Sequence, residues 1–184
     1  AGINEENSEY HLERGETFTT PALALTYSHE GLSGASRNFH RWGRKYKLMH
    51  GNQLRKILLN SWEGVYFDIN EQGMNQMMAD IADMGGELFV MDDGWFGGKY
   101  QRNKDNSSLG DWVVDTRKLP HGIEGLLSDA NNHGIKFGIW LEPEMSNTIS
   151  ELYEKHPEWV LKPRNREAQL GRGGKQVIHY LTNQ

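Results

Sequence analysis

Two adjacent carboxylates, Asp92 and Asp93, follow an apolar stretch and precede a glycine and Trp95 in the sequence ELFVMDDGWFGG, residues 87–98. The apolar stretch predicts a strand over 87–95, and the glycine predicts a turn where it ends. Carboxylates accept hydrogen bonds from vicinal hydroxyls, while an indole packs against the C–H face of a pyranose ring. The pattern therefore indicates a sugar site, although a capping Asp and a core tryptophan would give the same sequence.

Aromatic and acidic side chains also follow two other predicted strands, over 56–64 and 135–144. The residues concerned are Trp62, Trp140, Glu142 and Glu144. In parallel α/β architectures, ligands bind beyond the carboxyl ends of the strands, so we expect these side chains to lie close together. A lone tryptophan at such a place is more often a core residue. Three similar strand ends nevertheless favour a binding site.

Other residues are candidates for supporting the pocket. Glu142 and Glu144 would share one face of an extended chain, as an acid/base pair or as salt-bridged support, and we favour support. Asp111 and Trp112, in SLGDW, lie in a long polar connection and either line or cap the pocket. The GRGGK sequence lacks the spacing and the Ser or Thr of a phosphate-binding loop. We expect it to bring Arg172 towards a ligand.

The elements that position these residues alternate along the chain. We predict a strand, a helix, a strand, a helix, a strand, a helix and a strand, over 56–64, 71–84, 87–95, 122–134, 135–144, 147–156 and 176–181. Ser146 or Asn147 is the predicted cap of the last helix. Strands separated by single helices pair in parallel with right-handed crossovers. This predicts an α/β fold, as an open sheet or as about half of a (β/α)8 barrel, which takes about 250 residues.

The first fifty residues differ from the rest. Residues 1–15 are polar and aperiodic, and residues 17–27 are β-branched and apolar, as in an edge strand. Residues 34–49 carry aromatic side chains at spacings of three and four, which predicts a basic helix. We therefore divide the chain into residues 1–50 and 51–184.

The composition excludes several classes of partner. The chain has 184 residues and a formal net charge of −5, and Lys and Arg are not concentrated in any long stretch. Binding of nucleic acid or of an anionic membrane is therefore not expected. The sequence has no run of about 18 apolar residues, no cysteine and no HExxH. We expect no membrane span, no metal and no organic cofactor. A start at Ala1 rather than Met is typical of an excised piece.

Seven segments stand in order along the chain: NSWEGVYFDI, LFVMDDGWFG, SLGDW, KLPHGIEGL, GIKFGIWLEPEM, LYEKHPEW and GRGGKQV. Together they resemble the bacterial α-galactosidases of glycoside hydrolase family 36, over about residues 17–183. The resemblance implies a (β/α)8 catalytic barrel between an N-terminal β-sandwich and a C-terminal β domain. Residues 17–27 would be the last strand of the sandwich and the basic helix a connector. Residues 51–184 would be the first half of the barrel, with about four strands and three helices.

Carried over by motif, the resemblance implies a galactose subsite lined by Trp62, Asp92, Asp93, Trp140 and Arg172. The two aspartates would bind the O4 and O6 hydroxyls. A site that binds the axial 4-hydroxyl of galactose leaves buried carboxylates unpaired when that hydroxyl is equatorial, as in glucose. The expected supporting residues around the subsite are Trp95, Asp111, Trp112, Glu142 and Glu144.

The resemblance implies a retaining α-galactosidase that acts on terminal α-galactosides such as raffinose or melibiose. We expect the parent enzyme to be a homo-oligomer. The sequence leaves its compartment open, and the cytoplasm or periplasm of a bacterium is favoured over a membrane. Retaining glycosidases need a nucleophile and an acid/base about 5 Å apart, and in this family both lie on later strands. We therefore expect no catalytic residue before Gln184 and no activity from this chain alone. The chain departs from the family near its end, where Tyr180 in QVIHYLTNQ replaces an expected Asp.

Several alternatives remain open. Within the family, the activity could be that of a raffinose-type galactosyltransferase or of an α-N-acetylgalactosaminidase. From a different class, the chain could be a non-catalytic α/β carbohydrate-binding module. Such a module should fold stably alone, whereas half a barrel exposes two unpaired strand edges. A nucleotide-binding domain is the least favoured alternative, because both GxGxxG and Walker signatures are absent from the sequence.

Overall fold

The chain forms two compact units, Ala1–Arg55 and Lys56–Gln184. The computed structural model describes residues 10–162, 165–171 and 174–178. In this described part of the chain, no helix is long and apolar enough to cross a lipid bilayer.

In the first unit, helix α1 spans Gly31–Tyr46 and replaces the helix predicted over 34–49. Its last turn carries Arg44 and Lys45, which suit the negative end of the helix dipole. The helix begins three residues before and ends three residues before the predicted bounds, an error that is common where a frayed end has no strong cap. The predicted basic helix is thus confirmed with shifted ends.

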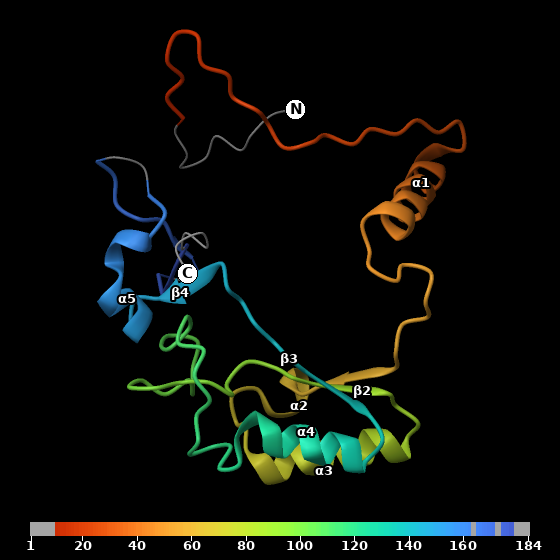
Figure 1. The fold of residues 1–184 in the computed structure, drawn as a ribbon, viewed down its shortest axis with the longest axis vertical. Helices are drawn as coiled ribbons and strands as arrows, with labels where there is room; N and C mark the ends of the chain where they lie inside the picture. Colours follow the sequence, from red (N-terminus) through yellow and green to blue (C-terminus); the bar gives the residue numbers. More distant parts are fainter. Residues whose placement is uncertain (1–9, 163–164, 172–173, 179–184) are drawn as a thin grey trace. The chain divides into compact units, whose positions relative to one another are not determined.

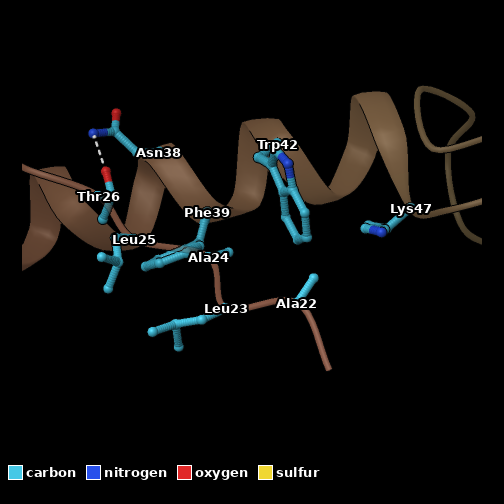
Figure 2. Close-up of a pocket in the computed structure, with 9 residues that line it drawn as sticks. All are labelled: Ala22, Leu23, Ala24, Leu25, Thr26, Asn38, Phe39, Trp42 and Lys47. Atoms are coloured by element: carbon cyan, nitrogen blue, oxygen red, sulfur yellow. Dashed lines mark hydrogen bonds between the residues drawn. The ribbon is translucent and has the colours of Figure 1, made fainter. Parts of the chain in front are cut away.

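Residues 17–27 form no strand, so the strand predicted there is wrong. A strand needs the hydrogen bonds of a neighbouring strand, and the described residues of this unit contain no strand that could pair with it. The segment lies instead along α1, where residues 22–26 and Phe39 line an apolar groove (Figure 2). Asn38 Nδ2 fastens the segment to the helix by donating a hydrogen bond of 3.0 Å to Thr26 Oγ1.

In the second unit, three parallel strands form a sheet in the order β1 (Leu58–Asn60), β2 (Leu88–Met91) and β3 (Lys136–Ile139). Helices α3 (Glu71–Asp83) and α4 (Gly122–Asn132) alternate with these strands along the chain, and they lie side by side on one face of the sheet (Figure 1). The predicted parallel α/β arrangement is confirmed for these elements. Each strand is shorter than predicted, because residues at both of its predicted ends belong to the neighbouring loops.

The core of this unit lies between the sheet and its two helices. Met74 and Met78 of α3 are four residues apart, so they face the same side, and both are fully buried with Phe89 of β2 and Leu126 of α4. Burial of each such side chain contributes about 1.5–3 kcal/mol. Asn70 begins α3 by accepting the backbone N–H of the third helical residue on its side chain. The core thereby fixes the strands whose ends carry the candidate residues.

The predicted fourth parallel strand is wrong. A second sheet has the order β4 (Met145–Asn147), β6 (Gln176–Ile178) and β5 (Leu170–Gly171), and all its pairs are antiparallel. Gln176 opposes Asn147 in the register of β4 and β6. A short apolar run does not reveal the direction of the strand that it joins, since its partner is distant in the sequence. The predicted departure at Tyr180 lies outside the described residues.

Helix α5 spans only Glu151–Lys155, and a 3-10 turn, η1 (Pro157–Trp159), follows it. Both residues predicted to cap this helix, Ser146 and Asn147, are fully buried in β4 instead. The actual cap is Ser150, whose hydroxyl accepts the backbone N–H of the third residue after it at 3.0 Å. Several Ser and Asn residues precede this helix, and only tertiary packing decides which one caps it.

Candidate functional site

A pocket of about 270 Å³ lies where the chain leaves the three parallel strands. Its lining residues are mostly aromatic or acidic, and they are Trp62, Phe67, Asp92, Asp93, Asp105, Trp140 and Glu142. Trp62 follows β1, the two adjacent aspartates follow β2, and Trp140 follows β3. The structure therefore brings together residues from all three strand ends, as expected for a site beyond the carboxyl ends of a parallel sheet.

Asp92 is held by the neighbouring end of β1. Its backbone N–H donates a hydrogen bond of 3.0 Å to Ser61 Oγ, and its Oδ2 accepts one of 2.6 Å from Asn60 Nδ2. Its Oδ1 accepts the backbone N–H of Asp93 at 2.7 Å. The side chain is half-buried. Both carboxylate oxygens are thus fixed in direction, while a carboxylate retains further acceptor capacity.

Asp93 is held by a buried arginine. Arg102 Nε donates to Asp93 Oδ1 at 2.8 Å, and Arg102 Nη2 donates to Asp93 Oδ2 at 2.6 Å. This is the bidentate geometry that a planar guanidinium makes with a carboxylate. The side chain of Arg102 is completely buried, and that of Asp93 is 8% exposed. Asp93 therefore presents its carboxylate to the pocket in one fixed orientation.

Two indoles provide apolar surface on the pocket. Trp62 is the first residue of the short helix α2 (Trp62–Val65), and the rings of Tyr66 and Phe67 pack edgewise against it at centroid distances of 5.2 and 5.1 Å. Trp140 packs edgewise against Trp112, 6.1 Å away. Such aromatic neighbours restrict the rotation of both indoles.

The predicted supporting residues have different places. Trp95 is 3% exposed in the core, stacks against Trp112 and donates its Nε1–H to the Trp140 carbonyl oxygen at 3.1 Å. Trp95 and Trp112 therefore contact Trp140, and neither of them lines the pocket. Glu142 lines the pocket, whereas Glu144 is exposed and is not among the lining residues.

Asp111 does not line this pocket. Its Oδ2 and Oδ1 accept the backbone N–H groups of Glu151 and Leu152, each at 2.9 Å, at the start of α5. Burial raises the pKa of Asp111 above its ordinary value, although these two hydrogen bonds oppose the change. The predicted ligand residue Arg172 lies outside the described residues.

The sequence-based reasoning missed Phe67, Arg102 and Asp105. Arg102 and Asp105 belong to the run QRNKDN, which has the composition of an exposed polar loop. Arg102 is nevertheless fully buried, and it reaches Asn147, a residue 45 positions away. A polar run gives no signal of such contacts. The one available hint was the position of this loop directly after the two aspartates.

The side chain of Lys118 connects three backbone segments beside the pocket. Its ammonium donates hydrogen bonds to the backbone oxygens of Phe67, Gly94 and Arg102, at 2.9, 2.8 and 3.1 Å. Burial lowers the pKa of Lys118, while nearby carboxylates, including that of Asp93, oppose this shift. The ammonium thereby joins three segments whose side chains line or support the pocket.

The pocket combines fixed acceptors with aromatic surface. Four carboxylates line it, from Asp92, Asp93, Asp105 and Glu142, between two tryptophans. Within the described residues, no three His, Asp or Glu side chains are grouped so that they could hold a metal ion. Acceptors that are fixed beside indole rings suit a ligand with several hydroxyl donors and an apolar C–H face, which is the chemistry of a pyranose.

Residues 17–184 match the Melibiase family. Alpha-galactosidase AgaA from Geobacillus stearothermophilus is 45% identical over 182 residues, which are 97% of this chain and 24% of that protein. Alpha-galactosidase 1 from Pediococcus pentosaceus is 40% identical over 185 residues, 96% of this chain and 25% of that protein. The chain thus spans about a quarter of the length of these curated relatives.

Solved structures of the same group are also similar. The A355E variant of Geobacillus stearothermophilus AgaA, a GH36 α-galactosidase crystallised with 1-deoxygalactonojirimycin, superposes with a TM-score of 0.74 and 43% identity. The matched region is 83% of this chain and 21% of that one. The A355E D478A variant, in complex with stachyose, gives the same values.

Proposed function

The chain belongs to the Melibiase family, and the solved structures that it resembles are glycoside hydrolase family 36 α-galactosidases. We therefore propose that it carries the galactose-recognition part of a retaining α-galactosidase. The observation that carries the proposal is the pocket that Asp92 and Asp93 line together with Trp62 and Trp140. In this role the two aspartates accept hydrogen bonds from the O4 and O6 hydroxyls, and Arg172 adds a contact. The substrates are terminal α-galactosides of the raffinose type, since variants of AgaA were crystallised with stachyose and with raffinose.

The proposal includes the architecture. Strands β1, β2 and β3 are the first strands of a (β/α)8 barrel, because parallel strands in sequential order, with helices on one face, are the unit from which such barrels are built. In the first unit, helix α1 is the connector between an N-terminal β-sandwich and the barrel. The whole enzyme is a homo-oligomer.

The bond-breaking carboxylates belong to other strands of the whole enzyme. A retaining glycosidase places a nucleophile and an acid/base on either side of the anomeric carbon, about 5 Å apart. Asp92 and Asp93 are adjacent on one strand end, and Asn60 and Arg102 hold them there. This arrangement suits the binding of neighbouring hydroxyls. It does not suit attack and protonation from two sides.

A hybrid enzyme tests the proposal. In this hybrid, the segment of Geobacillus AgaA that aligns with this chain is replaced by the corresponding residues of this chain. We expect the hybrid to hydrolyse p-nitrophenyl α-galactoside and to prefer it to the α-glucoside. A hybrid that melts cooperatively but neither hydrolyses the galactoside nor binds galactose in a calorimeter would contradict the proposal.

The isolated 184-residue chain provides the second measurement. We expect it to bind galactose weakly, to release no p-nitrophenol and to self-associate on a sizing column, because a partial barrel leaves strand edges unpaired. Turnover by this chain alone would overturn the assignment of the catalytic carboxylates to other strands. A monomeric chain with a cooperative melt would instead favour a self-contained carbohydrate-binding module.

A further inference from the structure

Every donor of the Arg102 side chain is hydrogen-bonded beside the candidate pocket. A guanidinium has five N–H donors, and all five find an acceptor here. Nε and one Nη2 hydrogen bind Asp93, the other Nη2 hydrogen binds Asp105 Oδ1 at 3.1 Å, and the Nη1 hydrogens bind the Ser107 carbonyl and Asn147 Oδ1, both at 2.9 Å. The side chain has no exposed surface. Its position is therefore determined by five directed hydrogen bonds.

These bonds connect the pocket with the second sheet. Asp93 follows β2, whereas Asn147 is the last residue of β4. Asn147 itself is saturated, because its Oδ1 also accepts the Leu109 N–H and its Nδ2 donates to the carbonyl oxygens of Asp105 and Lys175. A shift of Arg102 would disturb both ends of this network. The orientation of Asp93 thus depends on contacts that do not themselves touch the pocket.

Asp105 shares the same guanidinium and lines the same pocket. Its Oδ1 accepts from Arg102 Nη2 and from Gln176 Nε2, at 3.1 and 3.2 Å. Its side chain is 31% exposed, against 8% for Asp93. A carboxylate has about four lone-pair sites, so it accepts several donors at once. Asp105 therefore has both a fixed position and a surface that a ligand in the pocket can reach.

The charges favour a neutral donor-rich ligand over a structural role alone. Four carboxylates, including those of Asp93 and Asp105, line the pocket, and together they offer many acceptor sites to a ligand with several donors. Burial of a cation is costly unless its partners are fully bonded. A core that needed only stability would gain as much from apolar residues of similar size. Carboxylates on the wall of a pocket are explained when they receive hydroxyl donors from a ligand.

We propose that Arg102 is a positioning residue, which holds Asp93 and Asp105 in the orientation that sugar hydroxyls require, and that Asp105 is a further substrate-binding carboxylate. The inference rests on the proposed function. Asp105 becomes one more contact residue of the candidate subsite. The polar loop 101–106 determines the orientation of Asp93 through Arg102.

The structure offers a matched control for Arg102. Arg117 makes the same bidentate pair with Asp115, with Nε–Oδ1 and Nη2–Oδ2 distances of 2.6 and 2.8 Å. Its side chain is 50% exposed, and neither residue lines the pocket. A general effect of losing an Arg–Asp fork should therefore also appear in Arg117→Lys, although more weakly because Arg117 is exposed.

The experiment uses the hybrid enzyme with Arg102→Lys, Asp105→Asn and the controls Arg117→Lys and Asp115→Asn. Lysine keeps the charge but loses the planar fork, and asparagine keeps an acceptor oxygen for Arg102. For Arg102→Lys we expect kcat/KM on p-nitrophenyl α-galactoside to fall about 10- to 100-fold, as for a misplaced contact. We also expect the preference for the α-galactoside over the α-glucoside to narrow about tenfold.

Asp105→Asn should raise KM about tenfold and change kcat less, since it removes a contact that is present in the ground state. The two controls should stay within about twofold in both quantities. A role of Arg102 in stability alone would lower the melting temperature and leave the galactoside-to-glucoside ratio unchanged. That result, or an equal loss in Arg117→Lys, would overturn the inference about Arg102. An unchanged KM in Asp105→Asn would overturn the assignment of Asp105. An inactive unmutated hybrid would instead count against the proposed function.

Discussion

Asn60 Nδ2 donates a hydrogen bond of 2.6 Å to Asp92 Oδ2 and so joins the last residue of β1 to the first residue after β2. Asn60 also accepts the backbone N–H of Trp62 on its Oδ1 at 2.7 Å. One amide side chain thereby orients a carboxylate and begins the turn that places an indole on the same pocket. The parallel register, in which Asn60 lies opposite Val90, makes this contact possible.

Asn60→Ala should therefore weaken substrate binding and turnover, although Asn60 itself does not line the pocket. We expect kcat/KM of the hybrid for p-nitrophenyl α-galactoside to fall about tenfold, because Asp92 loses a fixed partner. Asp92→Ala should lower the same kcat/KM about 100-fold or more. The double variant should lose less than the product of the two single losses, since part of the effect of Asn60 acts through Asp92. Effects that multiply in the double variant would contradict this coupling.

Trp140→Ala should lower the affinity for galactose about tenfold in calorimetry. The pocket loses an aromatic face whose contact with the sugar contributes about 1.5 kcal/mol to the binding free energy. Trp159→Ala is the matched control. Trp159 is half-buried, stacks on His156 at 3.7 Å and does not line this pocket. We expect its substitution to leave the affinity for galactose unchanged. Equal losses in the two variants would show that Trp140 acts through general stability.

The predictions that held depend on local patterns. Met74 and Met78 recur at the helical spacing, and the apolar run before Asp92 has the length of a strand, so the parallel sheet and its two helices could be predicted from short windows. The same short stretches of sequence predicted which residues follow each strand. This is why the adjacent aspartates and both tryptophans could be expected on one pocket before any geometry was known.

The predictions that failed depend on distant partners. Asn147 has the residue type of a helix cap, but it is a buried strand residue because Arg102 and Lys175 both bind its amide. β6 reads as another strand of the parallel sheet, yet its direction is set by β4, about thirty residues earlier. Asp105 has no distinguishing neighbours in the sequence. Its place on the pocket depends on Gln176, 71 residues away.

Gly94→Ala should distort the pocket. Gly94 has φ of +111°, and an added Cβ would approach Phe67 Cα at 3.1 Å and Phe67 O at 3.2 Å. We expect a loss of about 1–3 kcal/mol in unfolding free energy from the backbone conformation, together with reduced activity, because Phe67 lines the pocket. Gly134→Ala is the control, since Gly134 has φ of +72° but nothing within 4 Å of an added Cβ. It should lower the melting temperature of the hybrid and leave kcat/KM unchanged.

The contact between α3 and the residue that precedes α4 should depend on pH. Glu71 Oε1 binds His121 Nδ1 at 2.6 Å, and Glu71 Oε2 accepts the His121 backbone N–H at 2.9 Å. The hydrogen bond from His121 lowers the pKa of Glu71, and Glu71 raises the pKa of His121. A lowered carboxyl pKa stabilises the fold above the ordinary value of 4.5, and a raised histidine pKa stabilises it below the ordinary value of 6.5. The pair therefore stabilises the fold fully between these two values.

This stabilisation is lost as the pH rises through the raised pKa of His121 and as it falls through the lowered pKa of Glu71. His121→Ala keeps the backbone N–H, so it removes only the side-chain pair. The difference in melting temperature between the hybrid and this variant should be largest near pH 5.5 and should shrink towards about pH 8. Because the His121 side chain is 78% exposed, solvent screening keeps the difference small. Glu71→Gln should remove the same pH dependence, and a difference that stays constant from about pH 5.5 to 8 would show that the two side chains do not form a charged pair.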